Sequence, residues 1–444
     1  MSALDLSLQD SVITTDQRRL CPVTRNKRVP DRCATKPPLI LLGGEVNALS
    51  ISRSLSAAGV EVYALGESSS PLRFSRHCHW ITTPPKCAAE DAWAEFLSRS
   101  DSDHLQGSVL LAACDSAIEF IAHNRETLAE KFLLDESDPQ SQLCMLDKLC
   151  TYRTAREAGV PTPRFWSLDS LDCIDAIRSQ LVYPLLVKPR LSHLFVPRFK
   201  TKYLLVSCFD ELVTTLQKVK DTKIEYLLME YIEGADDQLC SYYTYLDSDG
   251  QPLFHFTKRV VRRHPINQGN ACYHVTDHND ELHELSLRLF DQAGLRGLAN
   301  AEFKRDARDG TLKLMECNAR FTAANGLVAE SGLDLGLFVY NRVTGQPHAD
   351  YTDYRDNVRL WYPVEDFRAF LQLHSRGELT LLRWLRSIMH RKTLPVFRWT
   401  DPLPSLVGVA RYVRRLASKT CRSLRRCQIW STRSSSQPSV LQSK

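Results

Sequence analysis

The sequence predicts an α/β protein, and three observations favour that class. Residues 37–66 read as a strand, a helix and a strand, which is the repeating unit of a parallel sheet. Residues 225–264 and 298–318 contain the longer strand patterns of paired sheets. Residues 376–444 hold 15 lysines and arginines against two acids, whereas the rest of the chain holds 42 basic and 50 acidic residues. We therefore expect an α/β body followed by a basic C-terminal extension.

The composition is that of an ordinary globular protein. Of the 444 residues, 43% are hydrophobic and 25% are charged. No window approaches the roughly 18 apolar residues of a membrane span, and residues 1–36 lack the apolar segment of a signal peptide and are expected to be disordered. The 14 cysteines, Cys144 and Cys150 included, show no metal-binding spacing. We expect reduced thiols in a cytoplasmic protein of two or three domains.

The N-terminal unit begins with an apolar strand at Leu39–Leu42. The helix that follows has apolar residues at helical spacing, and Gly59 suits its C-terminal end. The turn Gly43-Gly44 is not a G-x-G-x-x-G motif; it is either a ligand-binding turn at the helix N-terminus or a tight turn that needs glycine. Residues 108–124 repeat the strand, turn and helix.

The middle of the chain alternates between helices and strands. Its predicted elements are a helix from 147 that ends at Gly159, a strand over 183–190 with Lys188 near its end, a partner strand over 202–207, a helix over 209–219, a strand over 225–234, two long strands around a D-S-D-G turn, and a helix over 280–293.

The most informative stretch is the hairpin formed by 299–304 and 312–318. A symmetric register around Gly310 places Glu302 opposite Glu316 and Lys304 opposite Leu314. Like charges in that position repel unless a proton or a cation lies between them. The alternative is a solvated hairpin with two exposed glutamates, but the apolar residues on the other face predict a covered sheet.

The same strand places further polar groups beside these acids. Asn318 lies two residues beyond Glu316, and Arg320 lies two residues beyond Asn318, on the same face. Two carboxylates and an amide oxygen form a ligand set suited to Mg²⁺, and the guanidinium could hold an anion beside the metal.

These residues, in this order, resemble the ATP-grasp superfamily. The segments "GLANAEFKRD", "GTLKLMECNARF" and "GLVAESGLDL" are similar to its metal-binding end, and "DKLCTYRTAREAGVPTP", "PLLVKP" and "LLMEYIEGADDQ" are similar to its nucleotide-binding segments. The nearest branch is the carboxylate–amine ligases, related to carbamoyl-phosphate synthetase and to D-alanine and D-aspartate ligases. The resemblance implies a Rossmann-like domain over 37–138 and an ATP-grasp module over 139–346, in which two α+β subdomains clasp ATP.

The resemblance also implies roles for individual residues. Lys148 and Lys188 would neutralise the phosphates of ATP, and main-chain groups around Glu230 and Ile232 would read the adenine edge. The ribose hydroxyls would bind Asp236 or Asp237, between which the sequence does not choose. The implied metal ligands are Glu302, Glu316 and Asn318, which would hold Mg²⁺ or Mn²⁺, and the implied catalytic residues are Arg320 and Arg259, with Arg262 as a spare.

The implied reaction joins a small-molecule carboxylate to an amine through an acyl phosphate. The rival hypothesis is a non-catalytic nucleotide-binding protein. The observation that favours it is the sequence of residues 189–202. Many members of the superfamily have a glycine-rich lid at this place, whereas this chain has no glycine there. Side chains there (Arg190, Ser192, His193 and Lys200) would have to contact phosphate instead.

The C-terminal part is expected to be a basic helical extension over 347–430 and a disordered tail over 431–444. Residues 404–427 have apolar side chains near helical spacing with arginines and lysines between them. Such a helix either packs its apolar stripe on the body or makes a weak contact with an anionic membrane. The segment has no motif for specific nucleic-acid binding.

Overall fold

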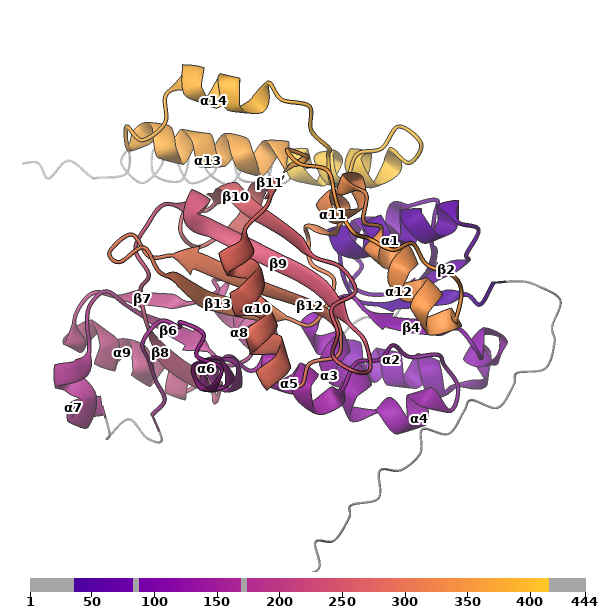
Figure 1. Ribbon diagram of the computed structural model, residues 1–444, viewed down its shortest axis with the longest axis horizontal. Coiled ribbons are helices and arrows are strands. Elements are labelled where there is room, and N and C mark those ends of the chain that lie inside the picture. The colour runs from indigo at the N-terminus through magenta and orange to yellow at the C-terminus, as the bar shows by residue number, and fades with distance from the viewer. Residues whose placement is uncertain (1–35, 83–87, 169–173, 415–444) are drawn as a thin grey trace, which may run out of the picture. The chain divides into compact units, whose positions relative to one another are not determined.

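The computed structural model describes residues 36–82, 88–168 and 174–414, which form three sheets with helices around them (Figure 1). The predicted segments 1–35, 415–430 and 431–444 lie outside the described residues. Parallel and antiparallel sheets occur together, which confirms the predicted α/β class. Among the described residues, no helix has both the length and the apolar character needed to cross a bilayer.

The first sheet is parallel and has the strand order β3-β2-β1-β4. All four residues of β1 are apolar and fully buried, as expected for a central parallel strand. The strands and helices of this region are β1 (Leu39–Leu42), α1 (Val46–Ala57), β2 (Val62–Leu65), β3 (His79–Ile81), α2 (Ala89–Ser98), β4 (Val109–Ala112), α3 (Asp115–His123) and α4 (Arg125–Ala129).

The second sheet is a small antiparallel one with the order β5-β8-β6-β7. Helix α9 covers it with Leu212, Leu216 and Val219, which lie at helical spacing and are fully buried. The elements of this region are α5 (Pro139–Leu146), α6 (Lys148–Glu157), β5 (Phe165–Trp166), α7 (Ile174–Ile177), β6 (Leu185–Pro189), α8 (Ser192–Phe199), β7 (Leu204–Val206), α9 (Phe209–Lys220) and β8 (Tyr226–Glu230).

The third sheet has the order β13-β12-β9-β10-β11-β14. Its strands alternate between two faces: Ala301 and Phe303 pack on helix α10, while Glu302 and Lys304 point to the opposite face. Figure 1 shows α10 lying across this sheet. The elements are β9 (Leu239–Leu246), β10 (Phe256–His264), β11 (Asn270–Asp277), α10 (Asp280–Gln292), β12 (Gly297–Arg305), β13 (Leu312–Asn318) and β14 (Arg359–Trp361).

One hydrophobic core joins the first and third sheets. Helices α11 (Asn325–Ser331) and α12 (Leu335–Thr344) pack on α1, and the same cluster includes Tyr243 and Tyr245 of β9. The two sheets are therefore held by shared packing. The domain boundaries at 138 and 346 stay predictions.

The C-terminal extension corrects one expectation. The region after 346 was predicted to be helical, but β14 enters the third sheet and pairs with β11. Two helices follow it, α13 (Pro363–Ser375) and α14 (Leu381–Ile388), and residues 403–414 are also helical. Strand β14 pairs because Leu360 is fully buried and extends the apolar surface of the sheet.

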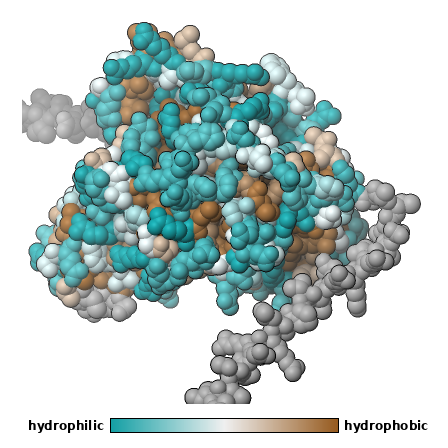
Figure 2. All heavy atoms as spheres, in the orientation of Figure 1, coloured by the Kyte–Doolittle hydropathy of each residue, from teal (hydrophilic) through white to brown (hydrophobic). Residues whose placement is uncertain are grey.

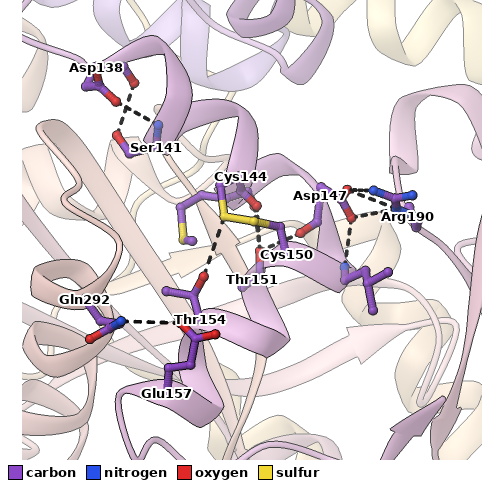
Figure 3. Close-up of a disulfide and its surroundings, with 12 residues drawn as sticks. Asp138, Ser141, Cys144, Asp147, Cys150, Thr151, Thr154, Glu157, Arg190 and Gln292 are labelled. Carbon is purple, nitrogen blue, oxygen red and sulfur yellow. Dashed lines mark hydrogen bonds and ion pairs between the residues drawn. A yellow bond between two sulfur atoms is a disulfide. The ribbon is translucent and has the colours of Figure 1, made fainter. Parts of the chain in front are cut away.

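The prediction that all cysteines are reduced is wrong for one pair. Cys144 and Cys150 form a disulfide that joins the end of α5 to the start of α6 (Figure 3). The sequence gives no hint of it beyond a separation of six residues, because the approach of the two side chains depends on the sharp bend between the helices.

Candidate active site

A cavity of about 390 Å³ lies between the second and third sheets. This volume is within the range of roughly 300–1,000 Å³ that is usual for small-molecule sites. Seven lysine and arginine side chains line it against three carboxylates, so the cavity suits a strongly anionic ligand. The charged lining residues are Lys148, Lys188, Lys202, Lys258, Arg263, Lys304, Arg320, Asp115, Glu302 and Glu316.

The predicted pair of opposed acids is present in the cavity wall. Glu302 of β12 pairs with Glu316 of β13, and Asn300 pairs with Asn318 in the same ladder. Burial alone would raise the pKa of Glu316, but Lys148, Lys188 and other nearby cations outweigh it and lower that pKa to about 2. Glu316 therefore stays ionised at neutral pH.

The predicted pairing of Lys304 with Leu314 is wrong because β13 contains a bulge. Beyond Glu302 the register shifts by one residue, so that Phe303 faces Leu314 and Lys304 faces Lys313. The carbonyl of Met315, at the bulge, accepts hydrogen bonds from Tyr152 Oη at 2.8 Å and from Lys188 Nζ at 3.1 Å. These two donors come from distant elements and hold the bulge in place.

The two predicted phosphate-binding lysines both lie in the cavity. Lys148, the first residue of α6, is buried and places Nζ 3.3 Å from Glu316 Oε1 and 2.7 Å from Ser192 Oγ. Lys188 is buried in β6, where burial lowers its pKa while Glu316 and Glu302 oppose that shift. The lysines and the acids therefore form one compact charged cluster.

The helix junction that carries Lys148 is firmly braced. Asp147 accepts a hydrogen bond from the amide of Leu149 and so caps α6, and it also pairs with Arg190 (Figure 3). The Cys144–Cys150 disulfide spans the same bend. Lys148 therefore projects from a backbone that is fixed on both sides.

The residues of the predicted metal site fit a divalent cation. The amide nitrogen of Asn318 donates to Asn300 Oδ1 at 3.1 Å, and Asn300 in turn donates to the carbonyl of Tyr242 at 3.0 Å. This chain of hydrogen bonds uses the nitrogen of Asn318 and leaves its oxygen for a metal, beside the carboxylates of Glu302 and Glu316. The oxygen donors and their charge suit Mg²⁺.

A polar row crosses the sheet from these acids. Glu302 pairs with Ser241 of β9, and Ser241 pairs with Lys258 of β10. Lys258 is buried, donates to Ser241 Oγ at 2.9 Å, and has a pKa that burial lowers and Glu302 opposes. Sequence reasoning missed Lys258, although a correct pairing of β9 with β10 would have identified it.

The predicted roles of Arg259 and Arg262 are not supported by their positions. Arg259 is on the other face of β10, with its side chain 45% exposed and 4.0 Å from Asp277 Oδ2. Arg262 forms a buried ion pair with Asp366 of α13 at 2.6 Å. The alternation of β10 therefore brings Lys258, not Arg259, to the cavity.

Arg320 lies in the cavity wall as predicted and has a partner that the sequence does not reveal. Its guanidinium pairs with Asp115, the first residue of α3, which follows the parallel strand β4. Burial would lower the pKa of Arg320, but Asp115 outweighs it and raises that pKa. The pair joins the first sheet to the hairpin of β12 and β13 that carries the predicted metal ligands.

The predicted adenine-binding linker is only partly in the cavity. Ile232 lines it, together with Met229 and Tyr231. Glu230 is turned away: its amide donates to the carbonyl of Arg164 at 2.8 Å, and its carboxylate pairs with Arg164 and Arg308.

Neither predicted ribose ligand lines the cavity. Asp236 is buried and pairs with Arg263 at 2.5 Å, and Asp237 is exposed on the surface.

Lys304 is another residue that sequence reasoning missed. It donates to the carbonyls of Ile232 and Gly234 at 2.9 and 2.7 Å and so fixes the linker from the sheet side.

Residues 189–202, predicted to be a glycine-free loop, contain helix α8. The helix forms because Phe195 is fully buried in the core of the second sheet and stacks on Phe199 at 4.2 Å between ring centroids. Of the four side chains considered as phosphate contacts, Ser192 lines the cavity. His193 pairs with Glu119 at 2.8 Å, and Arg190 pairs with Asp147 and Glu225; Lys200 ends the helix in a left-handed conformation.

His274 lies on the cavity face of β11. Burial is the main cause that lowers its pKa well below the usual range, so the imidazole is neutral. Its Nε2 lies 3.2 Å from the carbonyl of Ala271 and donates to it, which leaves Nδ1 buried and without a hydrogen-bond partner in the described structure. A substrate N–H group could therefore donate to Nδ1.

The chain is similar in sequence to a characterised ligase. It is 23% identical over 394 residues to the D-aspartate ligase of Enterococcus faecium (strain Aus0004), a match that covers 81% of this chain and 92% of that protein. No protein-family model matches the chain.

Solved structures show the same fold. The N5-carboxyaminoimidazole synthetase of Staphylococcus aureus, complexed with ADP, has a TM-score of 0.56 at 18% identity over 72% of this chain and 80% of that one. The biotin carboxylase domain of the Hydrogenobacter thermophilus 2-oxoglutarate carboxylase, in complex with MgADP, ADP and bicarbonate, has a TM-score of 0.57 at 16% identity over 72% of this chain and 73% of that one.

Proposed function

We propose that this chain, which has the ATP-grasp fold, is an ATP- and Mg²⁺-dependent ligase that joins a carboxylate to an amine. The observation that carries the proposal is the charged cluster of the cavity. Two opposed acids and an amide oxygen face two buried lysines, with Lys148 Nζ 3.3 Å from Glu316 Oε1. Lysines and a divalent cation are the partners that a triphosphate requires.

The first step is attack of a substrate carboxylate oxygen on the γ-phosphorus of ATP, which gives an acyl phosphate and releases ADP. Lys148 and Lys188 would neutralise phosphate oxygens, and Arg320 and Lys258 would face the transferred group. Glu302, Glu316 and Asn318 would hold Mg²⁺, which would supply positive charge that offsets the negative charge of the phosphates. These cations lower the repulsion between an anionic nucleophile and an anionic phosphoryl group.

In the second step an amine nitrogen attacks the acyl carbon, phosphate leaves, and the nitrogen loses a proton. The neutral imidazole of His274 faces the cavity and would accept a hydrogen bond from the amine. The similarity to a D-aspartate ligase makes amino acids the first carboxylates to test. Both substrates would be small molecules.

We infer a cytoplasmic location, because the reaction consumes ATP. Cytoplasmic thiols keep most protein cysteines reduced, and the Cys144–Cys150 disulfide would be an exception to that rule.

The test is an incubation of the full chain with ATP, Mg²⁺ and pooled D- and L-amino acids, followed by phosphate detection and a product mass spectrum. The proposal expects phosphate release that depends on an added carboxylate, and a product whose mass equals the sum of two substrates minus water. Tight ATP binding without any phosphate release would overturn it and favour a non-catalytic nucleotide-binding protein.

A further inference from the structure

Helix α14 presents an apolar side to solvent. Leu381, Leu382, Leu385 and Met389 just beyond its end are between 42% and 81% exposed. The other side of the helix packs on α13, where Trp384 stacks on Phe370 at 4.7 Å and donates to Asp366 at 2.9 Å. Only part of the apolar arc of this helix is therefore used in the fold.

The helix over 403–414 turns its apolar side outward as well. Leu403, Leu406, Val409 and Val413 are between 52% and 59% exposed. Arg411 lies on the opposite side and donates to the carbonyls of Ser68 and Ser69, just after β2, at 3.2 and 2.8 Å. The side toward the body is mixed, with buried Pro404 and half-buried Val407 and Arg411, so most apolar side chains of this helix face away from the body, unlike those of an ordinary surface helix.

Of the two alternatives left open for the apolar stripe of 404–427, packing on the body does not hold for the residues up to 414. The remaining residues of that stripe lie outside the described part of the chain. Trp399, between the two helices in sequence, is 88% exposed. Tryptophan is enriched where protein meets the interface of a bilayer.

Basic side chains accompany these apolar ones. Residues 376–414 hold eight lysines and arginines and two acids, and one of the acids, Asp401, is buried against Arg53. Within the described residues, Arg383, Arg386 and Arg391 have no ion-pair partner and are exposed. Figure 2 shows brown apolar and teal polar side chains side by side at the edge of the molecule where Figure 1 places α14.

We propose that this apolar and basic surface binds the headgroup region of an anionic lipid bilayer. The surface consists of the outward residues of α14 and of the 403–414 helix, together with Trp399. Apolar side chains would enter the interface, and the flanking arginines would attract anionic headgroups. Helix α14 has 8 residues and is far too short to cross a bilayer, which takes about 20.

The positive charge of this surface disfavours two other binding partners, a second copy of the chain and the segment 415–444 of the same chain. A second copy of the chain would bring two basic surfaces together, which is unfavourable. Residues 415–444 add seven lysines and arginines and no acid, so this segment of the same chain has the same sign of charge.

The experiment is co-sedimentation of the full chain with vesicles of phosphatidylcholine alone or with 30% phosphatidylglycerol, about 30 mol per cent being enough to give a strongly negative surface. We expect binding to the anionic vesicles that falls steeply as salt is raised, and little binding to the neutral ones. Absence of binding to anionic vesicles would overturn the proposal. Salt-insensitive binding to both vesicle types would overturn its electrostatic part.

Variants locate the contact. Leu385→Glu with Met389→Glu, and separately Arg383→Glu with Arg386→Glu, should each reduce partitioning by about tenfold or more. The matched controls are Val182→Glu with Leu205→Glu, both exposed in the region of the second sheet, and Lys218→Glu with Lys220→Glu on α9. An equal loss of vesicle binding in the α14 variants and in the control variants would overturn the assignment of the contact to this surface. A dimer seen by light scattering that dissociates on the Leu385→Glu change would also overturn it, because this surface would then bind a second copy of the chain.

Discussion

Glu302 and Glu316 stand directly opposite each other on neighbouring strands, with their carboxylates in the wall of a cavity that also contains Lys148 and Lys188. The lysines compensate part of the repulsion between the acids, and a divalent ion would compensate the rest. Under the proposed function this relationship would couple nucleotide binding to metal binding, because the same charged residues would contact both ligands.

Replacing either acid by its amide should abolish most of the turnover. Glu302→Gln and Glu316→Gln keep the side-chain shape but remove a negative metal ligand, so phosphate release should fall on the order of 100-fold, since a metal supplies several kcal/mol of charge stabilisation. Glu281→Gln, which alters a surface pair with Arg305, is the matched control and should leave the rate unchanged. Wild-type rates in both cavity variants would remove the metal assignment.

Neighbouring residues of β10 should differ sharply in effect. Lys258→Met removes a buried cation from the cavity and should lower kcat/KM about tenfold or more, the loss of one charge-assisted contact. Arg259→Met changes the opposite, solvent-facing side of the strand and should have little effect. Steady-state kinetics on the two variants decide the matter, and a larger loss for Arg259→Met would reverse the assignment of faces.

Nucleotide affinity should weaken as the pH rises through about 8. Burial is the largest cause that lowers the pKa of Lys304 to about 8, so the folded protein loses this cavity charge above that pH while the unfolded chain keeps it. Because the pKa of Lys304 is lower in the folded protein than in the unfolded chain, the charged side chain destabilises the fold below about pH 8. This penalty disappears as the pH rises further.

The measurement is the Kd of a fluorescent ATP analogue between pH 6.5 and 9.5, about the range over which a lysine with a lowered pKa titrates. The Lys304→Gln variant retains hydrogen-bond donors for the carbonyls of Ile232 and Gly234, and should show weaker binding without the inflection. An unchanged inflection in that variant would assign the titration to another group.

Breaking the disulfide should cost stability. Cys144→Ser and Cys150→Ser each remove a bond that closes a short loop, which lowers the free energy of unfolding by about 2 kcal/mol on chain-entropy grounds. Urea unfolding of both variants and of the wild type measures the difference. With a dithiol reductant present, the wild type should lose most of its advantage; if the three proteins are already equal without reductant, the bond contributes nothing to stability.

The parts of the site that sequence reasoning predicted came from local patterns and from the resemblance to a known superfamily. A symmetric register around Gly310 predicted that Glu302 faces Glu316, and alternation placed Asn318 beside them; in the structure this facing depends on the bulge at Met315, because the register nearest the turn would otherwise put Glu302 opposite Met315. Lys148 and Lys188 were predicted from the resemblance of their segments to the nucleotide-binding segments of the ATP-grasp superfamily. The βαβ unit of 37–66 was predicted because β1 is apolar throughout and α1 is amphipathic.

The parts that failed depend on contacts between distant residues. The bulge at Met315 is held by Tyr152 and Lys188, which are more than 120 residues away in sequence. Arg320 finds Asp115 at a separation of 205 residues. Arg259 was predicted and Lys258 was missed because identifying Lys258 needed the register of β9 with β10, which no short turn fixes.

Isothermal titration of an ATP analogue with and without Mg²⁺ tests the central claim most directly. If Glu302 and Glu316 hold the metal, Mg²⁺ should tighten analogue binding to the wild type by at least about tenfold, and this tightening should vanish in Glu302→Gln and in Glu316→Gln but persist in Glu281→Gln. An equal effect of Mg²⁺ on all four proteins would contradict the account.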